Sequence, residues 1–60
     1  MLIVTMLHNG VTFYLRGTVF TSRGRAQEYE NGAEAMLAVE KAKKFLARKS
    51  MAKNIRIVEA

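Results

Sequence analysis

The sequence predicts a small α+β domain: an antiparallel sheet of three or four strands with one helix packed on one face, in the order β-β-(β)-α-β. Three observations lead to this prediction. An Asn-Gly dipeptide lies between two β-rich runs near the start of the 60-residue chain. A long run of good helix formers without Gly or Pro occupies the second half. A last apolar run, rich in β-branched residues, follows it. The length suffices for one domain, residues 1–60.

The first two strands are predicted for residues 2–8 and 11–16, with Asn9-Gly10 as the turn between them. Both residues of such a turn need positive φ, which Asn and Gly tolerate best. Cross-strand partners share a face, so a two-residue turn fixes which side chains lie together. One face belongs to the core and carries Leu2, Val4, Met6, Val11, Phe13 and Leu15. The opposite, mixed face carries Ile3, Thr5, Leu7, Thr12, Tyr14 and Arg16.

The segment before the helix allows two interpretations. Residues 18–21 can prolong the second strand past a bulge at Gly17, and residues 21–24 are typical of a turn. We assign residues 25–30 to a third strand, with a helical turn as the alternative. If residues 25–30 fold over the mixed face of the sheet, that face is not open.

The helix is predicted to run to about Lys49, with Asn31 as its N-cap. Glu34 can return a hydrogen bond to the N–H of the cap, as in a capping box. Glu40 and Lys44 have the spacing of a favourable i,i+4 ion pair. The apolar stripe that faces the sheet consists of Ala35, Ala38, Val39, Ala42, Phe45 and Leu46.

The chain closes with a return loop at residues 50–53 and a last strand at residues 54–58. Ile55 and Ile57 alternate with Arg56, so the isoleucines face the helix and the arginine faces outward. Because the chain has a single helix, no second helix covers the mixed face of the sheet.

The residue inventory argues against catalysis. The chain has no Cys and a single His, so disulfides and thiolate metal sites are excluded. It has no nucleophile elbow, P-loop, dinucleotide fingerprint or HExxH motif. His8 has no acid or nucleophile near it in sequence and is typical of a solvated or turn-stabilising residue beside a turn. We expect neither catalysis nor a cofactor.

The apolar start of the chain is typical of a β-strand and not of a targeting segment. Residues 1–7 lack a basic n-region and a small-residue cleavage site. They are also far fewer than the roughly 20 residues that a membrane span needs. We expect a cytoplasmic protein that does not enter a membrane.

Ten Lys and Arg against five acids give a formal net charge of +5. Such a charge permits binding to nucleic acid or to an acidic protein, although it also serves solubility alone. The two arginines that flank Gly24 can bind phosphates. On the helix, cations at positions i, i+3 and i+7 form a basic stripe opposite the core. In both cases a solvated surface is the alternative. The candidate nucleic-acid-binding residues are Arg16, Arg23, Arg25, Lys41, Lys44 and Arg48.

Two apolar surfaces are candidates for protein binding. An open apolar area on the mixed sheet face would be an interface, either with another protein or with a second copy of the chain. Its single exposed aromatic is fewer than the two or three that stack bases on RNA-binding sheets. On the helix, one leucine lies among the cations opposite the core stripe. The candidate partner-binding residues are Ile3, Tyr14, Arg16, Leu37 and Arg56.

From Phe13 onward the chain resembles small uncharacterised proteins encoded by bacteriophages. The shared pattern consists of Tyr14-Leu15, Phe20-Thr21, Ala26 to Tyr29, an Ala-rich helix with lysines, and Ile57-Val58-Glu59. The resemblance implies a β-β-β-α-β order with a third strand at Ala26, and it implies no activity. Short early phage proteins often bind a host enzyme. We therefore expect a non-catalytic protein-interaction module that modulates a larger host protein, with a small basic nucleic-acid-binding protein as the alternative.

Overall fold

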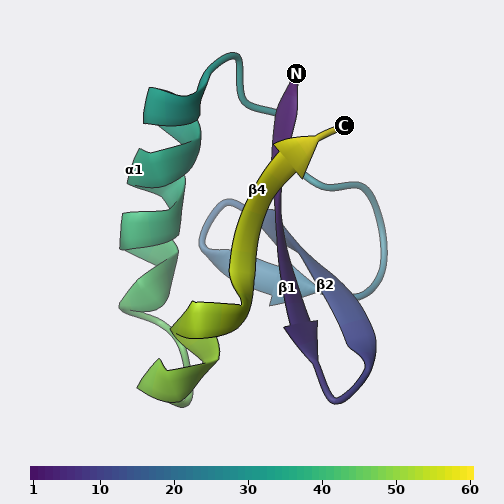
Figure 1. Ribbon diagram of the computed structural model, residues 1–60, viewed down its shortest axis with the longest axis vertical. Coiled ribbons are helices and arrows are strands. Elements are labelled where there is room, and N and C mark those ends of the chain that lie inside the picture. The colour runs from purple at the N-terminus through teal and green to yellow at the C-terminus, as the bar shows by residue number, and fades with distance from the viewer.

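The computed structural model describes residues 1–60 and contains a four-stranded antiparallel sheet with one α-helix against it (Figure 1). The strands lie in the spatial order β3-β2-β1-β4, so the last strand returns beside the first. The predicted α+β fold, with strands and helix in the order β-β-β-α-β, is confirmed. The elements are β1 (Leu2–His8), β2 (Val11–Arg16), β3 (Val19–Thr21), α1 (Gly32–Lys43), the 3-10 helix η1 (Lys49–Asn54) and β4 (Ile55–Glu59).

β1 and β2 form the predicted hairpin. His8 pairs with Val11 in the register that a two-residue turn requires. Asn9 and Gly10 have φ angles of 51° and 76°, and positive φ at both positions gives the turn a twist that matches the strands. The predicted division into a core face and a mixed face is confirmed, except that Val11 is exposed because it lies next to the turn.

The sequence predicted the third strand at residues 25–30, and this prediction is wrong. The third strand is β3, which pairs antiparallel with β2 after a reversal at Gly17-Thr18. Gly17 has a φ of 61°, which glycine adopts without strain, so the chain turns back there instead of prolonging β2 past a bulge. Residues 25–30 contribute only one isolated bridge, between Tyr29 and Leu2.

Residues 27–29 nevertheless hold the sheet together where β1 and β2 separate. The backbone N–H of Gln27 donates to the carbonyl oxygen of Leu15 at 3.0 Å, and Tyr29 exchanges two hydrogen bonds with Leu2 at 2.7 and 2.8 Å. The side-chain oxygen of Gln27 also accepts a bond from the N–H of Gly17 at 2.8 Å. The segment is thus bonded to both strands, and it delivers the Tyr29 ring into the core.

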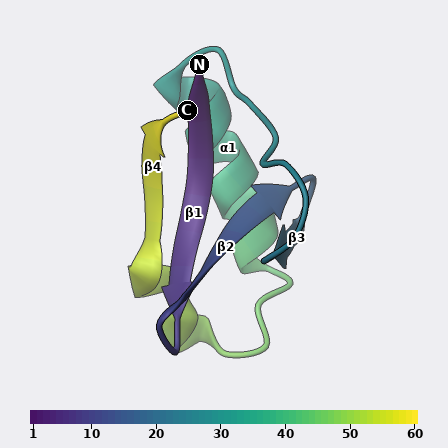
Figure 2. The ribbon, with the colours of Figure 1, turned by 90° about the vertical axis from the view of Figure 1, so that its right-hand side faces the viewer.

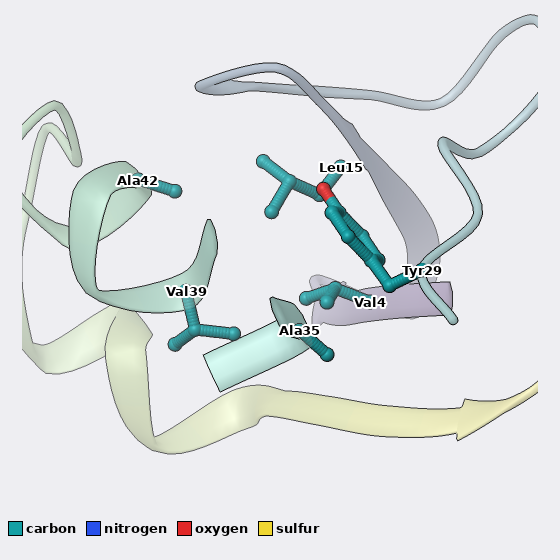
Figure 3. Close-up of a cluster of buried hydrophobic side chains, with 6 residues drawn as sticks. All are labelled: Val4, Leu15, Tyr29, Ala35, Val39 and Ala42. Atoms are coloured by element: carbon teal, nitrogen blue, oxygen red, sulfur yellow. The ribbon is translucent and has the colours of Figure 1, made fainter. Parts of the chain in front are cut away.

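The core lies between the sheet and α1. Figure 3 shows the Tyr29 ring beside Leu15 and Val4, with the alanines and the valine of α1 facing them. Ile55 and Ile57 of β4 pack against this cluster as predicted, and Arg56 is exposed. The cluster consists of Val4, Leu15, Tyr29, Ala35, Val39 and Ala42. A core of this size is expected for so short a chain.

α1 begins where the sequence predicted. The Asn31 side-chain oxygen accepts a hydrogen bond from the N–H of Glu34 at 3.0 Å, which satisfies one of the free donors of the first turn. The Glu34 carboxylate returns a bond to the N–H of Glu30 at 3.3 Å, one residue before the predicted Asn31. The cap is therefore confirmed, with a shifted partner for Glu34.

The helix ends at Lys43 rather than near Lys49. The N–H groups of Lys44 and Phe45 bond to carbonyls three residues back, at 3.3 and 3.0 Å. Such bonds tighten the last turn and break the 3.6-residue period. A further turn would also stack Lys44 against Arg48, and like charges at this spacing cost about 0.2–0.5 kcal/mol. Phe45 consequently leaves the predicted core stripe and is 70% exposed.

Candidate interaction surface

The mixed sheet face is open only in part. In Figure 2 α1 lies behind the sheet, and no helix covers the face toward the viewer. Leu7 and Val58 are exposed there, whereas Ile3 and Tyr14 are half-buried. Residues 24–26 and Glu28 line a shallow hollow together with Ile3 and Tyr14, so the segment before the helix shields this part of the face. The large apolar side chain with the highest exposed fraction, Phe45, does not belong to this face.

Three of the predicted nucleic-acid-binding residues gather at one turn. A Cβ added to Gly24 would meet the Arg16 guanidinium at 3.0 Å, so the Arg16 side chain lies over this loop between Arg23 and Arg25. The loop is stabilised by the Thr21 hydroxyl, which accepts a bond from the N–H of Arg23 at 3.2 Å. The three arginines are solvent-exposed and form a small basic cluster beside the mixed face.

The predicted basic stripe on the helix is wrong. Arg48 lies outside α1, because the helix ends at Lys43. Lys41 lines a hollow of about 420 Å³ between α1 and the β2–β3 turn together with the exposed Leu37, while Lys44 lines a different hollow. The predicted ion pair of Glu40 with Lys44 is also replaced, by one between Glu40 and Lys43 at 3.8 Å.

The most apolar hollow of the molecule lies on the helix side of the sheet, beyond the end of α1. We call it the Phe45 groove. It forms because the chain leaves the helix after Lys43, so residues 45–47 and Met51 cover the far end of the sheet only loosely. Its volume is about 270 Å³, and it is lined by Met6, Phe13, Thr18, Val19, Phe20, Ala42, Phe45, Leu46, Ala47 and Met51.

One large side chain of the groove remains exposed: Phe45 is 70% exposed, whereas Met6 at the base is buried. Val19 at the rim is also exposed, but it shares the mixed face with its strand partner Arg16. Phe13 is held from the other side by the His8 ring, whose centroid lies 6.4 Å from that of Phe13. The Asn9 side-chain amide also lies 3.3 Å from the His8 Nε2, so His8 contacts both Phe13 and the turn, in agreement with the turn-stabilising residue that the sequence predicted as one of two possibilities.

Positive charge is concentrated at the same end of the molecule. The acids Glu28, Glu30, Glu34 and Glu40 precede the end of the helix, and Figure 1 shows the start of α1 and both chain termini at the opposite end from η1. Residues 41–53 contain no acid and six cations: Lys41, Lys43, Lys44, Arg48, Lys49 and Lys53. The Phe45 groove and the basic segment therefore lie at the same end of the molecule.

Two of these cations are placed directly beside the groove. Lys44 and Lys49 line a neighbouring hollow of about 310 Å³ that shares Leu46 with the Phe45 groove. The one carboxylate in this hollow, that of Glu40, is paired with Lys43. Lys44 and Lys49 have no ion-pair partner, so their charges are free to attract an anionic group.

No cluster of metal ligands accompanies these surfaces. No group of three His, Asp or Glu side chains is close enough to hold a metal ion. The Tyr29 hydroxyl is buried without a hydrogen-bond partner, and burial raises its pKa above the ordinary value of 10.0. The Tyr29 side chain belongs to the core.

Sequence reasoning missed the Phe45 groove because it placed Phe45 in the core stripe. The signal that was present in the sequence is the density of cations after Val39. Repeated like charges within one turn of a helix disfavour its continuation, and this predicts an early helix end that leaves Phe45 out of the stripe. The exposure of Val19 could be found only after β3 had been placed.

The fold and surface define a small α+β protein with an apolar groove beside a basic segment. No protein-family model, curated protein or solved structure matches this chain. α1 spans 12 residues, and no helix of the structure has both the length and the apolar character needed to cross a membrane.

Proposed function

We propose that this chain is a non-catalytic protein-interaction module that docks on a larger protein through the Phe45 groove. The observation that carries the proposal is the 70% exposure of Phe45 at the edge of an apolar hollow. Fully burying a side chain of this size stabilises by about 1.5–3 kcal/mol. Aromatic residues beside concave apolar surfaces commonly dominate the binding energy of protein interfaces.

The groove suits a side chain of a partner better than a free small molecule. Its volume is about 270 Å³, below the roughly 300–1,000 Å³ typical of small-molecule pockets. Thr18 is the one side chain in its lining with a hydroxyl, so the lining offers few groups to orient a polar ligand. This proposal extends the docking function expected from the resemblance to phage proteins. It takes the partner to be a larger host protein in the cytoplasm.

The experiment compares partner capture by wild type, Phe45→Ser and Met36→Ser. Met36 is a matched control, because it is also an exposed apolar residue and lies on α1 outside the groove. Proteins retained by each variant are identified by mass spectrometry, and affinity is then measured with the purified partner. We expect wild type and Met36→Ser to bind one partner equally and Phe45→Ser to lose it. Equal binding by Phe45→Ser would reject the groove as the docking site.

A specific observation also favours a second candidate, nucleic-acid binding. Residues 41–53 contain six cations and no acid, and the same segment carries the exposed aromatic ring of Phe45; such rings stack unpaired bases. This candidate predicts that log affinity for single-stranded DNA or RNA falls steeply and linearly with log salt concentration. Phe45→Ser and Lys49→Ala should then both weaken binding. Absence of binding at low salt would reject it.

A further inference from the structure

We infer that the partner presents an acidic amphipathic segment, whose apolar side chains enter the Phe45 groove while its carboxylates meet the unpaired lysines beside it. The inference rests on the proposed function and adds the chemistry of the partner. It follows from the position of Lys44 and Lys49: the hollow that they line is adjacent to the Phe45 groove, and Leu46 lines both. An apolar anchor and a carboxylate close to it in one segment would satisfy both features at once.

The charge of the groove argues against a second copy of the chain as the occupant. A two-fold symmetric contact brings the same surface of two molecules together. Here it would place the basic segment, residues 41–53, opposite the same segment of the second copy, and neither segment contains an acid. Like charges across an interface suppress association, whereas an acidic partner converts the same charges into attraction and faster encounter.

The lining of the groove argues against nucleic acid as its occupant. Nine of the ten lining residues are hydrophobic, and a nucleic acid has no aliphatic side chain to fill such a hollow. The basic segment also contains five lysines and only one arginine, Arg48. Arginine is the preferred residue for bidentate phosphate recognition. The combination therefore favours carboxylates carried by an apolar scaffold.

The direct probe is a fluorescent synthetic peptide of about 16 residues, long enough to form a helix on binding, with Glu on one face and Leu and Phe on the other. One control peptide has the same composition in an order that has no apolar face. A second control has Lys in place of every Glu. Fluorescence anisotropy measures their binding to the full chain over a salt series.

Protein variants separate local from general electrostatics. We expect Phe45→Ser, and Lys44→Glu combined with Lys49→Glu, each to weaken binding of the acidic peptide by about tenfold or more, as loss of an interface anchor does. Lys41→Glu is the matched control, because Lys41 lines a different hollow and the variant reverses a charge in the same basic segment. It should change affinity by about twofold or less, because an exposed charge in a different hollow makes no direct contact with the peptide and is weakened by salt.

Every outcome decides for or against the inference. Equal binding of the peptide without an apolar face, or an equal loss with Lys41→Glu, would show non-specific charge attraction and overturn it. Phe45-dependent binding of a single-stranded oligonucleotide that is tighter than binding of the peptide would also overturn it. If no acidic peptide binds while the captured partner still requires Phe45, the inference fails and the proposed function stands. If the captured partner ignores Phe45, both fail.

Discussion

Tyr29 and Leu2 exchange two backbone hydrogen bonds, at 2.7 and 2.8 Å, although they are far apart in sequence. This pair anchors the segment before α1 between the separating ends of β1 and β2 and places the Tyr29 ring in the core. The segment before α1 therefore lies at the end of β1 that carries Leu2, and it does not cover the other end of the sheet. The Phe45 groove lies at the far end of the sheet, where Phe45, Leu46, Ala47 and Met51 border the strands.

Tyr29→Phe should leave stability unchanged or raise it by about 1 kcal/mol. The hydroxyl is buried without a partner, and an unsatisfied buried polar group costs about 1–3 kcal/mol. Urea denaturation measures the effect, with Tyr29→Ala as the control that should lose about 3–5 kcal/mol because it empties the core. A clear loss of stability in Tyr29→Phe would mean that the hydroxyl has a hydrogen-bond partner.

Stability should fall at alkaline pH through Tyr29. Burial raises the pKa of its hydroxyl in the folded protein above 10.0, because the charged form is disfavoured there. The unfolded chain therefore releases the proton first. This contribution is fully present below pH 10.0 and is lost as pH rises through the higher pKa of the folded protein. Denaturant midpoints from pH 8 to 12, roughly spanning tyrosine titration, should show a smaller alkaline loss in Tyr29→Phe than in wild type.

Asn31→Ala should destabilise the protein by about 0.5–2 kcal/mol, because it removes the side-chain acceptor at the start of α1. The bond in question joins the Asn31 side-chain oxygen to the N–H of Glu34 at 3.0 Å. Thermal unfolding followed by circular dichroism measures the change. Asn31→Asp keeps an acceptor oxygen and should retain wild-type stability. An equal loss in both variants would assign the effect to something other than the cap.

Phe45→Ser should change the free energy of unfolding by no more than about 0.5 kcal/mol, as for a surface substitution. Leu15→Ala should instead cost about 2–5 kcal/mol, since Leu15 is fully buried. Chemical denaturation of the two variants beside wild type makes the comparison. A loss in Phe45→Ser as large as that in Leu15→Ala would place Phe45 in the core, as the helical period predicted.

The hairpin, the helix start and the last strand were predictable because each depends on local chemistry. Asn9-Gly10 requires positive φ, Asn31 supplies a cap acceptor, and the alternation around Arg56 fixes its face. The position of β3 was not predictable, because three residues after Gly17 carry too little pattern to tell a reversal from a bulge. The segment before the helix is held by backbone bonds to Leu2 and Leu15 that depend on tertiary structure.

The candidate site was less predictable than the fold. Leu37, Arg56 and the arginines near Gly24 were correctly expected to be exposed. However, a helical period that is continued past Lys43 assigns Phe45 to the core, and the groove arises only because the helix stops early. Exposure of an apolar residue at a helix end depends on where the last turn tightens.

Site-specific photo-crosslinking tests most directly whether the Phe45 groove is the docking surface. A photoreactive phenylalanine replaces Phe45 in one variant and the exposed Met36 in the other, and both are irradiated in cells of the host. The groove model predicts a discrete adduct with a larger protein from position 45 and none from position 36. An adduct from position 36 alone, an adduct with nucleic acid, or no adduct from position 45 would contradict it.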